Sequence, residues 1–144
     1  MSSAARLYTP EVLALAVDLA RWPAQENLPL HGEARSPTCG STVTMDFGLD
    51  ADGLIESIGM RVRACAIGQA AAAIFARQAA GKGARELAEA LDRLEAWLDD
   101  EGPGPDWPDL DLIAPARDYP ARHGAILLPW RAALAALSSE PARR

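Results

Sequence analysis

Two cysteines, Cys39 and Cys65, are the side chains of this 144-residue chain whose chemistry and position first suggest a functional site. Cys39 lies between a proline and a glycine in residues 36–41, a composition that favours an exposed turn. Cys65 precedes an alanine-rich stretch of helix-forming composition, and the amino end of a helix favours the thiolate form of a cysteine. Thiolates bind metals and attack electrophiles, so both cysteines are candidate ligands or nucleophiles; the alternative is that they are small core residues.

A predicted β-hairpin brings the two cysteines toward each other. Residues 42–49 and 54–62 each alternate apolar and polar side chains with the period of two of a half-buried strand. Asp and Gly between the two segments favour a tight turn, and we expect a short edge strand near residues 32–35. Cys39 precedes the first strand and Cys65 follows the second, so two thiols at the open end of the hairpin would form half of a tetrahedral thiolate site.

Apolar spacing predicts helices on either side of the hairpin. Thr9 is a favourable N-cap and Pro10 a favourable first residue for a helix that Trp22-Pro23 ends. A closing helical segment ends near Leu137, and Pro129 should lie in its first turn or kink it. Two further helices are expected over residues 69–80 and 84–98.

Residues 99–111 connect the last two helices. They contain six acidic residues and three prolines but no basic residue, a composition typical of a solvated linker. We therefore expect this segment to be solvated and mobile.

Length, composition and charge limit the class of protein. One α+β domain is expected over residues 1–144, with a core at residues 7–137 and a frayed tail at residues 138–144. A net charge of −6 with scattered basic residues argues against nucleic acid as a partner, and no apolar run reaches the roughly 18 residues of a membrane span. The first ten residues lack the apolar core of a signal peptide, and two cysteines are too few for a disulfide scaffold, so we expect a cytoplasmic protein.

An ordered set of short motifs resembles the iron–sulfur cluster assembly scaffolds of the IscU/SufU/NifU N-terminal type. The set begins with Ser-Pro-Thr-Cys-Gly at residues 36–40 and continues through the Asp-Gly turn, Cys65 and the alanine-rich helix closed by Gly81-Lys82. Tyr-Pro-Ala-Arg at residues 119–122, with the apolar residues that follow, is similar to the family's last block, most closely in the SufU branch. The resemblance spans about residues 7–137. It implies a small antiparallel sheet packed by helices on one side, and an exposed site of three cysteines and an aspartate.

The sequence departs from that ligand set at two places. Ser41 stands where the family has the aspartate, and the place of the third cysteine falls on Gly124 or Ala125. His123, beside this place, is a candidate replacement ligand; the alternative is a surface or helix-capping histidine. Cys39, Cys65 and His123 would hold iron or zinc with an open position. A [2Fe–2S] cluster usually has four protein ligands, so a single copy would need outside ligands.

The resemblance implies a scaffold that binds iron or a transient [2Fe–2S] cluster through Cys39 and Cys65. A cysteine desulfurase would supply sulfur, recipient apoproteins would take the product, and the chain would be a monomer or weak homodimer. One alternative is enzyme-like, a sulfur relay in which Cys65 accepts persulfide sulfur and passes it on. The other is a binding module of the same fold that does not ligate metal.

Overall fold

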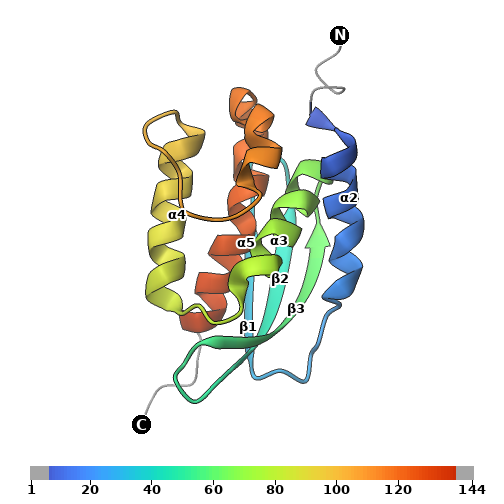
Figure 1. Cartoon of the computed structure of the whole chain (residues 1–144). Helices are drawn as coiled ribbons and strands as arrows, with labels where there is room; N and C mark the ends of the chain where they lie inside the picture. The colour runs from blue at the N-terminus through green and yellow to red at the C-terminus, as the bar shows by residue number, and fades with distance from the viewer. Residues whose placement is uncertain (1–6, 139–144) are drawn as a thin grey trace.

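The computed structural model of the protein describes residues 7–138 and shows one antiparallel sheet with helices on one side (Figure 1). The sheet has the order β1-β2-β3. Its strands are β1 (Leu30–Arg35), β2 (Thr42–Leu49) and β3 (Ile55–Arg63). The α-helices are α2 (Pro10–Asp18), α3 (Ala66–Ala79), α4 (Ala84–Leu98) and α5 (Pro120–Ser138), and the 3₁₀ helices are η1 (Leu19–Arg21) and η2 (Leu110–Asp118). The predicted α+β class is confirmed; residues 139–144 of the predicted tail lie outside the described residues.

The predicted hairpin and edge strand are confirmed, and the period of two explains the buried face of the sheet. Val43, Met45 and Phe47 of β2 have no exposed surface, and residues of β1 and β3 opposite them continue this apolar face. At the other end of the hairpin from the turn, Thr42 pairs with Arg63. The segments that carry the two cysteines therefore leave the sheet at the same end.

Helix α5 lies directly against β1 because Gly32 has no side chain. A Cβ atom at Gly32 would overlap backbone atoms of Ala132 and Ala136 in α5. Only glycine allows a helix backbone and a strand backbone to approach this closely. Helix α5 in turn contacts α3 and α4, so it is the central element of the helical layer.

The last helix begins earlier than its sequence suggests. The expected boundary was near Pro129, but α5 starts at Pro120 and continues through Pro129. Residues 125–130 are all buried, between the sheet on one side and α3 and α4 on the other. Burial on all sides stabilises this helix enough to offset the hydrogen bond that an internal proline removes. Helix α3 also starts three residues earlier than expected, at Ala66.

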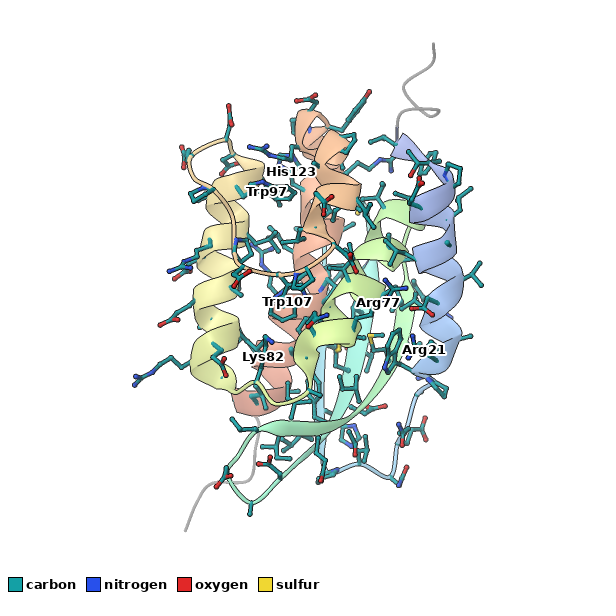
Figure 2. The ribbon with its side chains drawn as sticks, viewed as in Figure 1. Arg21, Arg77, Lys82, Trp97, Trp107 and His123 are labelled. Carbon is teal, nitrogen blue, oxygen red and sulfur yellow. The ribbon has the colours of Figure 1, made fainter. Side chains whose placement is uncertain are left out.

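The acidic connection between α4 and η2 is anchored, so its interpretation as a purely solvated linker is wrong. Trp107 is 6% exposed, and its indole Nε1 donates a hydrogen bond of 2.9 Å to the carbonyl of Ile74. Its ring stacks on Phe75 at 5.6 Å and meets Trp130 edge-on at 5.2 Å (Figure 2). The carboxylates stay at the surface while one tryptophan enters the core. A tryptophan within a proline-rich segment was the available sequence signal.

Within residues 7–138, no helix combines the length and apolar character that crossing a membrane requires.

We expect Trp107→Ala to lower the free energy of unfolding by about 3–5 kcal/mol, because it empties a buried aromatic position. Denaturation in urea measures this change, and hydrogen exchange of the amides of residues 100–109 should become faster. Asp106→Ala is the matched control: Asp106 is exposed in the same segment, and its loss should change stability by no more than about 0.5 kcal/mol. Equal stabilities of the two variants would contradict the anchoring role of Trp107.

Candidate functional site

Cys39 lies at the tip of a tight loop between β1 and β2. The loop is closed by two backbone hydrogen bonds, from Ser36 N to the Ser41 carbonyl at 2.9 Å and from Gly40 N to the Ser36 carbonyl at 2.8 Å. Gly40 has a φ of +76°, a conformation that glycine adopts without steric cost. The closed loop leaves the Cys39 side chain exposed.

Two serine hydroxyls tune the Cys39 thiol. The nearby hydroxyls of Ser36, first, and of Ser41 lower the pKa of Cys39 below its ordinary value, against a smaller opposing effect of burial. The Cys39 Sγ lies 3.1 Å from the Ser41 Oγ. Ser36 is buried, and in this conformation its hydroxyl forms no hydrogen bond within residues 7–138, either with Cys39 or with another residue. A hydroxyl that donates to a thiolate stabilises the charged form, so this loop favours the thiolate.

Cys65 is the N-cap residue of α3 but does not cap the helix with its side chain. Its backbone is extended, with φ −65° and ψ 171°, and its carbonyl accepts the first helical hydrogen bond, from Gln69 N at 2.9 Å. The thiol forms no capping hydrogen bond and is half-buried. The Cys65 thiol is thus not used as a helix cap, while the residue packs partly against the hydrophobic core.

Both cysteines lie just beyond the same end of the sheet. Cys39 is three residues before Thr42, Cys65 is two residues after Arg63, and Thr42 and Arg63 are cross-strand partners. The predicted placement of both cysteines at the open end of the hairpin is thus confirmed.

Helix α5 borders both cysteine-bearing segments with two residues that carry no ligating side chain. A Cβ atom at Gly124 would overlap the hydroxyl of Ser36 in the Cys39 loop. The Ala125 Cβ lies 3.2 Å from the position of a Cβ built on Gly68, in the first turn of α3. The place of the family's third cysteine thus faces the site, but glycine and alanine supply no ligand there.

His123 faces another part of the molecule. The Nε2 of His123 (Figure 2) lies 2.9 Å from the Arg117 carbonyl. The residue shares a surface hollow with Asp99 at the end of α4 and Arg131 of α5. Consecutive residues of a helix point about 100° apart, so with Gly124 against Ser36, His123 is directed toward α4. Among residues 7–138, no three His, Cys, Asp or Glu side chains form a group that could hold a metal ion. The predicted set of Cys39, Cys65 and His123 is therefore not assembled in this conformation.

Sequence reasoning missed two polar features. The influence of Ser36 and Ser41 on Cys39 was overlooked, although both serines lie within three residues of it. His31, which had no ligand-like context, pairs through Nδ1 with the Oδ1 of the buried Asp46 at 2.7 Å. The other carboxylate oxygen of Asp46 accepts a hydrogen bond from Gln25 N at 2.8 Å. The bond from Gln25 fixes the chain before β1 onto the sheet, and neither contact of Asp46 involves the cysteines.

Solved structures share this fold over nearly the whole chain. A NifU-like protein (N-terminal) from Brucella abortus is 32% identical, with 95% of this chain and 96% of that chain covered and a TM-score of 0.84. A putative iron–sulfur cluster assembly scaffold protein for the SUF system from Fervidobacterium islandicum AW-1 is 23% identical, with 92% and 97% covered and a TM-score of 0.80. At 23% sequence identity, the similarity to the Fervidobacterium islandicum protein shows a shared fold and no more.

No family model and no curated protein matches the sequence. The family assignment therefore depends on the solved structures, and the Brucella abortus protein matches in sequence as well as in fold. With 32% identity across almost all of both chains, the protein belongs to the NifU-like N-terminal family and has the fold of the iron–sulfur cluster assembly scaffolds.

Proposed function

We propose that the protein is a scaffold on which iron and sulfide assemble at Cys39 and Cys65 before they pass to a recipient protein. The observation that carries this proposal is the position of two free thiols at one end of the hairpin, neither of them in a disulfide. Family membership supports the same chemistry. Thiolates are the preferred protein ligands of iron–sulfur clusters.

A site with two cysteine ligands suits the temporary binding of iron and sulfide. Two thiolates satisfy half of a tetrahedral iron site, because Gly124 or Ala125 stands at the place of the third cysteine and Ser41 at that of the aspartate. Sulfide, a second copy of the chain or the thiols of a recipient would complete the coordination. His123 would join only after its ring had left the Arg117 carbonyl. Zinc accepts the same thiolates and would compete with iron.

The partners follow from this role. A cysteine desulfurase would deliver sulfur to the exposed loop, and recipient apoproteins would take the product from the same face. The chain would act as a monomer or as a weak homodimer that shares one [2Fe–2S] cluster. Two free thiols persist in a reducing compartment, which fits action in the cytoplasm.

Anaerobic reconstitution with iron and sulfide tests the scaffold. We expect the wild-type protein to bind both, with visible absorption from sulfur-to-iron charge transfer. Cys39→Ser and Cys65→Ser should each weaken iron binding by more than about tenfold, the loss that removal of an outer-shell partner of a ligand can already cause. Iron and sulfide analysis of the desalted protein measures the result. Retention of full iron in the double variant would contradict the proposal.

Two histidine variants serve as matched controls in the same assay. If His123 becomes a third ligand in the loaded state, His123→Ala should bind iron more weakly than His31→Ala. Equal iron affinities of both variants and the wild type would leave the thiols as the only protein ligands.

A sulfur relay is the second candidate, and the structure favours Cys39 for it, whereas the sequence had favoured Cys65. Cys39 is the exposed thiol and lies beside two hydroxyls. Its thiolate would attack the outer sulfur of a desulfurase persulfide. The new Cys39 S–S bond forms as the desulfurase S–S bond breaks, and the desulfurase cysteine leaves as a thiolate. No oxidant and no metal is consumed in this transfer.

Alkylation of metal-free protein tests the thiolate on which the relay depends. In a Cys65→Ser background, we expect Cys39 to react with iodoacetamide with a pH midpoint below that of an ordinary thiol. Ser36→Ala should raise this midpoint more than Ser41→Ala, because the Ser36 hydroxyl contributes more to lowering the pKa of Cys39. Mass spectrometry over a pH series measures the rates. An unchanged midpoint in both serine variants would show that the loop does not activate the thiol.

A further inference from the structure

The sheet has a second face, directed away from the helices (Figure 1). Side chains alternate along a strand, so the neighbours of Val43 and Met45 in β2 point to this outer face. Cross-strand pairing arranges the residues of the outer face in rows across the three strands. Two of these rows lie at the end of the sheet from which both cysteine-bearing segments leave.

The chain itself covers only the half of the outer face that is remote from the cysteines. Residues 23–25 lie against Gly59, where a Cβ atom would meet the Pro23 carbonyl at 2.7 Å. The Leu28 side chain lies 3.4 Å from a Cβ built on Gly48, and Asp46 accepts a hydrogen bond from Gln25 N. In the half near the cysteines, the same segment contributes an exposed contact from Glu26 to Arg61, and the arginines there remain exposed.

The uncovered half is rich in arginine. Its last row is Arg35–Thr42–Arg63 and the row before it is Glu33–Thr44–Arg61. All three arginines are exposed, and the threonines between them are half-buried. We call the three arginines and the two threonines, Arg35, Thr42, Thr44, Arg61 and Arg63, the outer basic patch.

The charges of the outer basic patch are largely uncompensated. Arg61 lies 3.7 Å from Glu26, an exposed ion pair that contributes little to stability. Arg35 and Arg63 form no ion pair with any described residue. They stand two strands apart, about 10 Å, on either side of Thr42. Two guanidinium groups without an ion pair therefore leave a local positive charge on a chain of net charge −6, and such a patch can attract an opposite charge on a partner.

We propose that the outer basic patch docks an acidic surface of a partner protein that acts at the cysteine site. Guanidinium groups bind carboxylates in a planar, two-pronged geometry, so Arg35 and Arg63 can fix the register of the partner as well as attract it. The role of this partner rests on the proposed function, since the patch adjoins the Cys39 loop and the strand that leads to Cys65.

A protein carboxylate surface fits better than a nucleic acid. Nucleic-acid binding replaces several counterions and needs clustered cations, whereas this patch has three arginines with Glu33 in the same row as Arg61. The net charge of −6 also disfavours long-range attraction of a phosphate polymer.

Titration with hexaglutamate, followed by NMR of the ¹⁵N-labelled protein, tests the docking surface. The protein carries Cys39→Ser and Cys65→Ser, so the result does not depend on metal or sulfur chemistry. We expect amide shifts in residues 33–35, 42–44 and 61–63, weakened by salt. Arg35→Gln with Arg63→Gln should lower the affinity about tenfold, since two exposed ion pairs are lost. Glu33→Gln should raise it, an effect that misfolding cannot mimic.

The matched control is Arg85→Gln with Arg93→Gln, which removes two exposed arginines from α4 and should leave the affinity unchanged. Equal losses in both double variants would overturn the proposal, because the effect would then reflect net charge alone. Shifts of the same size with hexaglutamine or inorganic phosphate would also overturn it. Sedimentation that shows self-association of the protein, lost in the patch variant, would replace the acidic partner with a second copy of this chain.

Discussion

The close contact between α5 and β1 is the constraint on which the arrangement of the site depends. Gly32 allows the backbone of α5 to lie on the sheet, and this fixes the path of the helix past the cysteine-bearing segments. Further along the same helix, Gly124 meets Ser36 and Ala125 meets Gly68 of α3. The three contacts use residues with small or no side chains. At Gly124 of this closely held helix, any side chain would require the Ser36 hydroxyl in the Cys39 loop to move.

The contacts that hold the layers of the fold together are therefore different from the residues proposed to bind metal. Aromatic packing around Trp107 and the Asp46 pairs hold the layers and the chain before β1, and neither involves sulfur. The thiols lie outside these networks, one at a loop tip and one at a helix start. A site with two thiolates and open coordination positions binds a metal less completely than a closed four-ligand site. Under the proposed function, incomplete coordination would suit a protein that passes its cargo on, and contacts with a partner at the adjoining sheet face would help to hold the complex together.

Sequence periodicity was sufficient for the elements with one buried face. The alternation in residues 42–49 and 54–62 predicted the hairpin, and hence the shared end from which both cysteines leave. Periodicity was insufficient for an element that is buried on all sides. Helix α5 is covered by the sheet and by other helices, and it continues through Pro129, where the sequence indicated a boundary or a kink. The direction of His123 depends on the rotation of α5 about its axis, which the Gly32 contact sets and no local pattern reveals. The burial of Trp107 depends on Phe75 of α3 and Trp130 of α5, which are distant in the sequence. The acidic segment around Trp107 therefore could not predict these partners.

The central claim is that the two thiols converge on one metal ion. X-ray absorption at the zinc edge tests it directly, with zinc as a redox-inert probe loaded at one equivalent. The account predicts two sulfur neighbours at about 2.3 Å in the wild-type protein and one in Cys39→Ser. A wild-type spectrum with no more than one sulfur neighbour would contradict it.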